Sequence, residues 1–374
     1  MDKHNLELVT ELRKKLHAEP ELSGNEAGTR KRLMEFLRNH TSLEIVDRGK
    51  WFYAVYRAGE GRPNLAFRAD MDAVAVNEPP GLPYASGNPG VAHKCGHDGH
   101  CAILAGFALE LDRLGADHNI YLLFQHAEEN GEGARECTAL INECKIDRIF
   151  GLHNMPGLPM GHVALKEGTL MCASEGISVY FTGTPAHAST PEKGINPAAA
   201  LAELILEIPK LSDPSLYQGM AMCTVIHGEL GTPGAFGVSA SRGSLSVTCR
   251  AQHDGDMEAL AKRLRECALA IAKKYGLGCE FSVHDSFPAT VNHHAGAEQV
   301  RDAARRLGLS LAELDEPTRG SEDYGHYLKR IPGAFFFLGA GDRPSLHSAD
   351  YDFPDEIIET GVELFKALAP CKAP

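Results

Sequence analysis

Residues 92–100 of this 374-residue chain are Ala92-His93-Lys94-Cys95-Gly96-His97-Asp98-Gly99-His100. This stretch combines a thiol, three imidazoles and a carboxylate, and an apolar segment with helical periodicity follows it. Cys95 and His97 are two positions apart, so an extended backbone would project both side chains to one side, within reach of one metal ion. Thiolates and imidazoles beside carboxylates bind first-row transition metals rather than magnesium or calcium. The alternative is a polar turn whose histidines only cap the next helix.

An alternation of apolar strands and helices surrounds this stretch. An amphipathic helix is predicted over residues 101–114, and two more within residues 5–40, separated by Pro20 and Gly24. Strands are predicted at residues 45–46, 52–56, 65–68, 120–124, 149–152 and 334–338. This order is typical of an α/β domain with a largely buried sheet, in which ligands bind beyond the carboxyl ends of the strands.

Polar residues follow several of these strands where ligands are expected. They are Asp70, Asp72, Glu128, Glu129, His153 and His347. Each alone is ambiguous, because acidic loops and hydrogen-bonded edge histidines are common. Cys95, His97, Glu129, His153 and His347 together form a set of five candidate ligands, which suits two metal ions that share one bridging ligand.

The carboxylates in this set suggest different roles. The side chains of the adjacent Glu128 and Glu129 should diverge, so that one binds metal while the other faces the substrate and takes a proton from the attacking water. Asp70 and Asp72 are candidates to orient the ligand imidazoles, with simple surface solvation as the alternative.

Residues 172–290 have a different pattern. Strands and helices are predicted in the order βαββαβ, at residues 176–182, 196–208, 222–230, 245–252, 257–275 and 279–287. This order predicts a ferredoxin-like domain inserted into a larger domain formed by residues 1–171 and 291–374. His187 lies in a loop of the insert, where it could donate a hydrogen bond to an oxyanion as a lid closes, or could be an ordinary exposed histidine.

Composition excludes several kinds of partner. The formal net charge of −13 argues against nucleic acid or an anionic membrane surface as a partner. Neither a secretory signal nor an apolar run of membrane-spanning length is found. The ten cysteines include no C-x-x-C pair, which favours reduced thiols and a cytoplasmic location.

These motifs, taken in order along nearly the whole chain, resemble the amidohydrolase branch of the M20 metallopeptidase family. That branch includes aminoacylases, hippurate hydrolases and plant auxin-conjugate hydrolases. The resemblance rests on residues 16–23, 68–73, 95–100, 127–129, 151–153, 187, 321–324 and 347–353.

The resemblance implies a zinc-peptidase-like catalytic domain, with a mixed sheet flanked by helices, plus the inserted α+β lid. It implies that Cys95, His97, Glu129, His153 and His347 bind two divalent ions of Mn, Zn, Co or Ni. Glu128 would be the general base, and His187 would polarise the scissile carbonyl, in several relatives across a homodimer formed through the lid. The implied reaction is hydrolysis of an amide bond in N-acyl amino acids or similar small amides.

The chain departs from this branch in four places. They are His126, Lys94, residues 77–80 and residues 237–240, where an Asn-Val-Ile-Pro-like segment is expected in the lid. No candidate ligand is lost, but the lid asparagine helps to hold substrate in relatives. Arg242 and Arg250 remain as candidate partners for a substrate carboxylate, or are solvated strand arginines.

Three other functions compete with the amidohydrolase. The same scaffold could act as a dipeptidase or carboxypeptidase, or as an aryl-amine deaminase. A non-catalytic binding or scaffold protein would not need a full set of ligands and base. A cysteine hydrolase using Cys95 and His97 has poor geometry, because the two residues are too close in sequence to face one carbonyl together.

Overall fold

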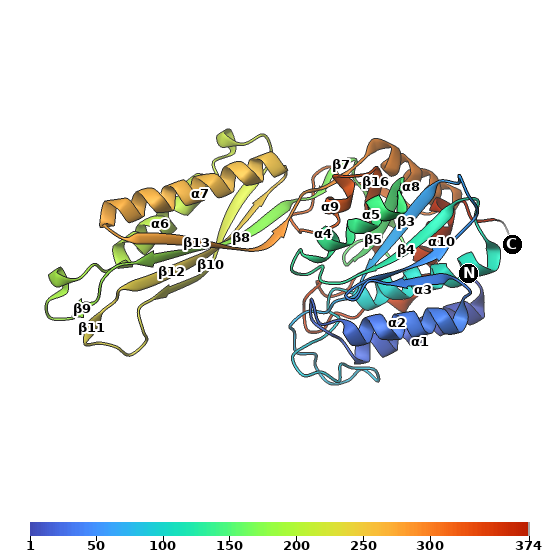
Figure 1. The fold of residues 1–374 in the computed structure, drawn as a ribbon, viewed down its shortest axis with the longest axis horizontal. Coiled ribbons are helices and arrows are strands. Elements are labelled where there is room, and N and C mark those ends of the chain that lie inside the picture. The colour runs from blue at the N-terminus through green and yellow to red at the C-terminus, as the bar shows by residue number, and fades with distance from the viewer. Residues whose placement is uncertain (373–374) are drawn as a thin grey trace. The chain divides into compact units, whose positions relative to one another are not determined.

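The computed structural model describes residues 1–372, which form two compact units. Unit 1 comprises Met1–Leu170, Thr290–Pro317 and the described residues from Asp323 onward, and unit 2 comprises Met171–Ala289 and Thr318–Glu322. Figure 1 shows the elements of both. Among the described residues no helix is both long and apolar enough to cross a lipid bilayer.

Unit 1, within the described residues, is built on an eight-stranded sheet in the order β1-β2-β4-β3-β5-β16-β6-β15. The central strands β4, β3, β5 and β16 are parallel, whereas β2 pairs with β4 and β6 with β16 in antiparallel fashion. The strands are β1 (Glu44–Asp47), β2 (Phe52–Tyr56), β3 (Asn64–Asp70), β4 (Asn119–Gln125), β5 (Arg148–Met155), β6 (Val163–Leu165), β15 (Leu311–Glu313) and β16 (Gly333–Gly339), with β7 (Gly168–Met171) and β14 (Thr290–Asn292) in a separate pair. The mixed α/β sheet predicted from the sequence is confirmed.

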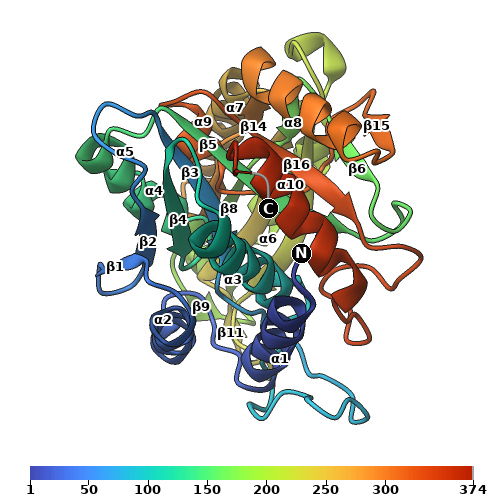
Figure 2. The ribbon, with the colours of Figure 1, turned by 90° about the vertical axis from the view of Figure 1, so that its right-hand side faces the viewer.

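Unit 1 also contains helices, some of which pack directly on the sheet and others on helix α3. They are α1 (Lys3–Ala18), α2 (Ala27–His40), α3 (His97–Leu114), α4 (Gly133–Cys137), α5 (Ala139–Cys144), α8 (His294–Arg306), α9 (Gly325–Leu328) and α10 (Ile358–Leu368). Helix α3 lies against β3 and is itself covered by α1 and α10 (Figure 2). Residues 97–111 of α3 are therefore buried on every side, which explains why its sequence is so apolar.

The start of α3 differs from the prediction. The helix begins at His97 rather than at Cys101, because Gly96 adopts a left-handed conformation (φ +94°) that turns the chain directly into the helix. The backbone of residues 95–97 is therefore a turn, and the expectation that an extended segment aligns Cys95 with His97 was wrong.

Unit 2 has, within its described residues, a four-stranded antiparallel sheet in the order β10-β12-β8-β13. Its elements in chain order are β8 (Ala173–Thr182), β9 (Ala186–His187), α6 (Ala198–Leu211), β10 (Ala221–Leu230), β11 (Val238–Ser239), β12 (Arg242–Ala251), α7 (Asp254–Tyr275) and β13 (Gly278–Phe287). Helices α6 and α7 pack together and bury one face of the sheet in a core of their own. This connectivity is that of a ferredoxin-like split βαβ fold.

Residues 318–322 group with unit 2, whereas the sequence analysis placed them in the larger domain. Main-chain contacts explain the difference. The amide of Cys172 lies 3.2 Å from the carbonyl oxygens of both Thr318 and Gly320, and the guanidinium of Arg250 donates to the carbonyl of Arg319 at 2.8 Å. A local sequence pattern cannot predict hydrogen bonds between segments that lie this far apart in the chain.

Candidate metal centre

The turn formed by Cys95, Gly96 and His97 depends on glycine for space as well as for conformation. A Cβ atom at Gly96 would overlap the side-chain amide of Asn154, and one at Gly99 would overlap the ring of Phe353. Gly96 therefore lets the start of α3 approach strand β5 closely, and Gly99 does the same for the loop that follows β16.

The five candidate ligands converge from four parts of unit 1. His97 is the first residue of α3, His153 lies in β5, Glu129 follows β4, and His347 lies in the loop after β16. The Cys95 sulfur is 3.4 Å from Nε2 of His153, and Oε1 of Glu129 is 3.7 Å from Nε2 of His97 and 3.4 Å from Nε2 of His347.

These residues form two groups of three, and within each group the possible ligand atoms lie within 4.8 Å of one another. One group is Cys95, His97 and His153, and the other is Cys95, Glu129 and His347. Cys95 belongs to both groups. The two groups could therefore hold two divalent ions, and Cys95 is available to both groups.

Unsatisfied polar atoms support the fit to a cation. Nε2 of His97 and Oε1 of Glu129 are buried and have no hydrogen-bond partner among the described residues. Buried polar atoms without partners are rare and ask for an explanation such as an ion. Thiolate, imidazole and carboxylate are together suited to a divalent first-row transition metal.

The electrostatics of the centre also favour a cation. Burial, reinforced by the charges of Glu129 and Glu128, raises the pKa of the Cys95 thiol well above its usual value. Burial alone would lower the pKa of His97, but the carboxylates of Asp70, Asp72 and Glu129 raise it to about 10. A divalent ion would balance the negative charge of these carboxylates, so that His97 need not be protonated, and it would favour the thiolate form of Cys95.

His153 is in a different state. Burial, together with the neighbouring His100, lowers the pKa of His153 well below its usual value. The ring is therefore neutral, which is the form that binds metal. Its Nδ1 lies 2.8 Å from the carbonyl oxygen of Asn154, so the proton sits on Nδ1 and Nε2 faces the Cys95 sulfur.

Glu128 lies beside the ligands. Its side chain is buried, and its Oε2 is 3.9 Å from Nε2 of His97. Glu128 and Glu129 thus both reach His97, so their side chains do not diverge as the sequence predicted. Glu129 also contacts His347.

Asp72 connects two of the candidate ligands. Nδ1 of His97 is 2.9 Å from the carbonyl oxygen of Asp72 and 3.3 Å from its Oδ1. Oδ2 of Asp72 accepts hydrogen bonds from the amide of Glu129 at 2.9 Å and from the hydroxyl of Ser23 at 2.7 Å. Asp72 therefore holds both His97 and Glu129 in place.

Asp70 contacts a histidine to which the sequence analysis gave no role. Its Oδ1 is 2.6 Å from Nδ1 of His100, and its Oδ2 accepts from Arg68 at 2.6 Å. Nε2 of His100 is in turn 2.5 Å from Oδ1 of Asn154. Asp70, His97 and His100 make a further buried group of possible ligands, a grouping that only the packing of α3 against β3 and β5 creates.

Glu26 is a second residue that sequence reasoning missed. Its buried carboxylate accepts from the amide of Ala127 at 2.7 Å, directly before Glu128. Burial and the nearby charge of Asp72 raise the pKa of Glu26 to about 7. No local signal marks Glu26, because 101 positions separate it from Ala127.

The other predicted site residues belong to unit 2. His187 is exposed in β9, and its Nδ1 accepts from the amide of Ser189 at 3.1 Å, which leaves the proton of the neutral ring on Nε2. Strand β9 pairs with β11, so that Val238 lies opposite His187. The segment 237–240, which departs from the amidohydrolase branch, is thus the direct support of His187.

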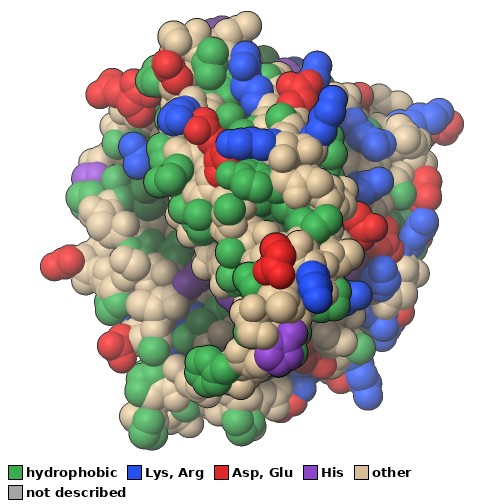
Figure 3. All heavy atoms as spheres, turned by 90° about the vertical axis from the view of Figure 1, so that its left-hand side faces the viewer, with side chains coloured by type: hydrophobic (Ala, Val, Ile, Leu, Met, Phe, Trp, Pro, Cys, Tyr) green, Lys and Arg blue, Asp and Glu red, His purple; other side chains and the backbone are tan. Residues whose placement is uncertain are grey.

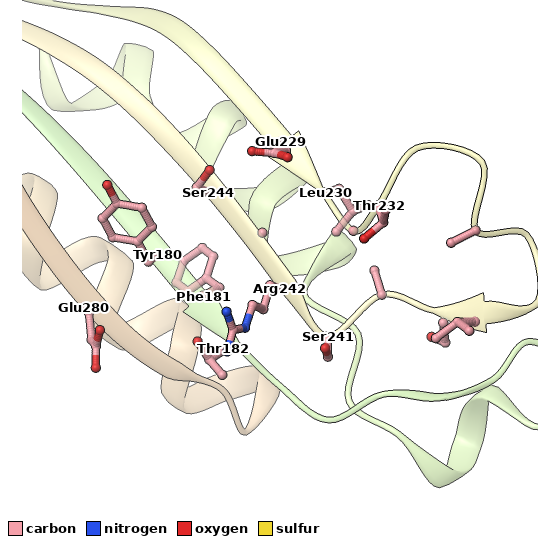
Figure 4. Close-up of a pocket in the computed structure, with 16 residues that line it drawn as sticks. Tyr180, Phe181, Thr182, Glu229, Leu230, Thr232, Ser241, Arg242, Ser244 and Glu280 are labelled. Carbon is pink, nitrogen blue, oxygen red and sulfur yellow. The ribbon is translucent and has the colours of Figure 1, made fainter.

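The two arginines of unit 2 differ in their surroundings. Arg242 is exposed beside Thr182 and lines a pocket of about 800 Å³ (Figure 4). The guanidinium of Arg250 is instead bonded to the carbonyl of Arg319 and, at 2.5 Å, to the hydroxyl of Ser321. Arg242 is therefore more available to a ligand.

The chain is similar to known proteins over most of its length. The model of the peptidase family M20/M25/M40 matches residues 66–370. N-acetylcysteine deacetylase of Bacillus subtilis is 30% identical over 96% of this chain and 95% of its own length. N-acetyldiaminopimelate deacetylase of Exiguobacterium sibiricum is 28% identical over 94% of this chain and 95% of its own. The crystal structure of the Bacillus subtilis YXEP protein, described as a dinuclear metal-binding peptidase of family M20, is 29% identical, covers 98% of both chains and superposes with a TM-score of 0.82.

Proposed function

The chain belongs to peptidase family M20/M25/M40, and from that premise we propose that it is a dinuclear metal-dependent amidohydrolase that removes the acyl group from N-acyl amino acids. The observation that carries the proposal is the pair of ligand groups that share Cys95. The relatives named as deacetylases of N-acetylcysteine and N-acetyldiaminopimelate favour an N-acetylated amino acid as substrate.

In this proposal Cys95, His97 and His153 hold one divalent ion, and Cys95, Glu129 and His347 hold the other. Two such ions would supply Lewis acidity for the scissile carbonyl and activate the attacking water. Asp72 keeps His97 and Glu129 in position through its contacts with both.

Glu128 is the proposed general base. Its carboxylate would take a proton from the water as the water attacks the carbonyl carbon, and would then return that proton to the leaving nitrogen. The buried position of Glu128 next to His97 supports this role.

His187 is the proposed donor to the carbonyl oxygen. The hydrogen bond from Ser189 to Nδ1 supports this role, because it leaves Nε2–H as the donor. We assign Arg242, rather than Arg250, to the substrate carboxylate, because Arg242 is exposed and Arg250 is engaged with main-chain and hydroxyl oxygens.

We further propose that the protein is a cytoplasmic homodimer joined through unit 2. Nearly all of the large hydrophobic side chains that are exposed belong to that unit, among them Leu206, Ile226 and Phe236. Figure 3 shows such side chains at the surface. Exposed apolar patches of this kind are typical of protein interfaces. Sedimentation of the wild type and of Ile226→Lys tests this, and a wild type that sediments as a monomer would contradict it.

The enzymatic proposal is tested by incubating the manganese-loaded protein with N-acyl amino acids and dipeptides and measuring the primary amine released. We expect release from N-acetyl amino acids, and its loss with EDTA. Release from dipeptides alone would indicate a peptidase. Free ammonia without a carboxylic acid would indicate a deaminase, and failure to bind any metal would contradict the proposal altogether.

A further inference from the structure

Lys94 directly precedes the shared ligand Cys95, and it is one of the residues that depart from the amidohydrolase branch. Its side chain is only 1% exposed. The ammonium group donates to the carbonyl of Tyr351 at 2.8 Å and contacts the carboxylate of Glu78. The main-chain carbonyl of Lys94 accepts a hydrogen bond from the amide of His347 at 2.7 Å.

The loop that carries His347 contains almost no regular secondary structure. Residues 340–357, all of them described, contain no strand and no α-helix, only the short 3₁₀ turn η3 (Asp355–Ile357). His347 has a left-handed backbone (φ +63°), which is uncommon for a residue other than glycine. Its side chain is 52% exposed, whereas His97 is buried and the side chain of Glu129 is 17% exposed. Contacts from outside the loop must therefore fix the position of His347.

Lys94 supplies such contacts at two points of this loop. The main-chain carbonyl of Lys94 holds His347, and its ammonium group holds Tyr351 four residues later. Because Cys95 is the next residue, the same short segment positions the shared ligand and the exposed one.

A buried ammonium group is costly unless it is paired with a negative charge. Glu78 provides that charge, and its carboxylate is itself fixed by His17, whose Nε2 is 2.9 Å away, and by the amide of Ser86 at 2.6 Å. Glu78 belongs to residues 77–80, another segment that departs from the amidohydrolase branch. The two departures, separated by 16 positions, therefore form one buried ion pair.

We propose that the Lys94–Glu78 ion pair is a positioning device for His347, which sets the affinity of the Cys95–Glu129–His347 group for its metal ion. This inference rests on the proposed dinuclear centre. Loss of the Lys94 ammonium group would remove one anchor of the His347 loop, the bond to the carbonyl of Tyr351, and would weaken the Cys95–Glu129–His347 group. The hydroxyl of Tyr351 would still accept from Asn154, so the loop would stay folded but be held less tightly. The Cys95–His97–His153 group, whose members lie on α3, β5 and the turn before α3, would keep its ion.

The test is a Co²⁺ titration of the metal-free protein, followed by visible absorption and by metal analysis after equilibrium dialysis. Lys94→Met removes the charge and keeps the length of the side chain. Lys166→Met is the matched control, because the Lys166 ammonium group also donates to two main-chain carbonyls, those of Leu314 and Asp315, in a loop that carries no candidate ligand. Thermal unfolding of all metal-free forms reports any general loss of stability.

We expect the wild type and Lys166→Met to bind two ions with the same affinities. Lys94→Met should bind the first ion as the wild type does and the second about 10–100-fold more weakly, as is typical when a group that orients a ligand is removed. Wild-type affinity for both ions in Lys94→Met would overturn the proposal, and so would an equal loss at both sites.

Glu78→Gln provides a second variant in case Lys94→Met does not fold. It leaves the bond from Lys94 to Tyr351 possible and removes only the paired charge, so we expect a smaller loss confined to the second ion. Unchanged binding in this variant would count against the ion pair. If the wild type itself binds fewer than two ions, the dinuclear centre is wrong and the role of Lys94 fails with it. If every variant binds two ions with wild-type affinity, only the role of Lys94 is refuted.

Discussion

The candidate site residues of unit 1 and unit 2 differ in how they are held. In unit 1, Cys95, His97 and Glu128 are buried, and charged neighbours such as Asp72 fix the main chain around them. In unit 2, His187 and Arg242 are exposed and rest on short local contacts, for instance between His187 and Ser189. A charged centre whose main chain is fixed by its neighbours favours tight binding of ions, whereas exposed residues held by local contacts can adjust to a ligand.

The largest expected effect lies in unit 1. Glu128→Gln should lower kcat by about 10²–10⁴-fold, because the amide cannot accept the proton of the attacking water. Metal content should stay at the wild-type value, since Glu128 belongs to neither proposed ligand group. Turnover and metal analysis of the same preparation check this. A kcat close to that of the wild type would mean that another residue is the base.

The corresponding change in unit 2 is His187→Ala. We expect kcat to fall by about 10²–10³-fold, as it does when one donor to an oxyanion is removed, while the two metal ions remain bound. His187→Gln, which retains an N–H donor, should recover part of the loss. If His187→Ala changes KM alone, the residue binds substrate and does not act in the transition state.

A smaller effect separates the two arginines of unit 2. Arg242→Met should raise KM for an N-acetyl amino acid by about 10–100-fold, the range expected for a lost hydrogen bond to a charged group, and should leave thermal stability unchanged. Arg250→Met should lower thermal stability and leave KM unchanged, because the Arg250 guanidinium holds Arg319 and Ser321 within unit 2. Thermal unfolding and Michaelis kinetics of both variants test this assignment. A rise in KM for Arg250→Met and a loss of stability for Arg242→Met would mean that Arg250 binds the substrate carboxylate.

The smallest effect concerns stability and its pH dependence. Burial would raise the pKa of Glu110, but Arg113, Asn5 and the amide of Asp2 lower it to about 2 from an ordinary value of 4.5. The stabilisation from its charge is therefore complete above about pH 4.5 and is lost as the pH falls toward 2. Glu110→Gln should lower the free energy of unfolding by about 1–2 kcal/mol at pH 7, and the difference should shrink in acid.

A matched comparison comes from unit 2. Glu203 accepts from Lys274 and Tyr275 at the surface, and Glu203→Gln should leave the free energy of unfolding almost unchanged. Urea unfolding of both variants between pH 2.5 and 7 measures the contrast. Equal effects would show that burial does not distinguish the charge pairs of the two units.

Local sequence patterns predicted the central strands of unit 1, its first helices and the main elements of unit 2, but not α4, α5 and α8–α10 of unit 1. The apolar strands, the break at Pro20 and Gly24, and the βαββαβ order of the insert all come from periodicities that span a few residues. Polar residues after strands identified Glu129, His153 and His347 as candidate ligands, because neighbouring parallel strands end at one edge of a sheet. Cys95 and His97 were identified from the composition of residues 92–100. The family expected from these motifs is confirmed by the match to residues 66–370.

Contacts between distant segments could not be predicted in this way. The bond of Glu26 to Ala127 joins positions 101 apart, and the position of His100 between Asp70 and Asn154 depends on α3 packing against two strands. In the sequence, Lys94 and Glu78 lie in two separate departures from the amidohydrolase branch, and only the fold shows that they form an ion pair.

The sequence by itself therefore predicted which residues are candidate ligands and which of the central elements present them, since both follow from local spacing and motifs. Only the tertiary structure decided which buried charges face one another, because burial and pairing depend on segments far apart in the chain. The contacts that only the tertiary structure decided include the anchoring of His347 by Lys94. The proposed difference in affinity between the Cys95–His97–His153 group and the Cys95–Glu129–His347 group depends on that anchoring.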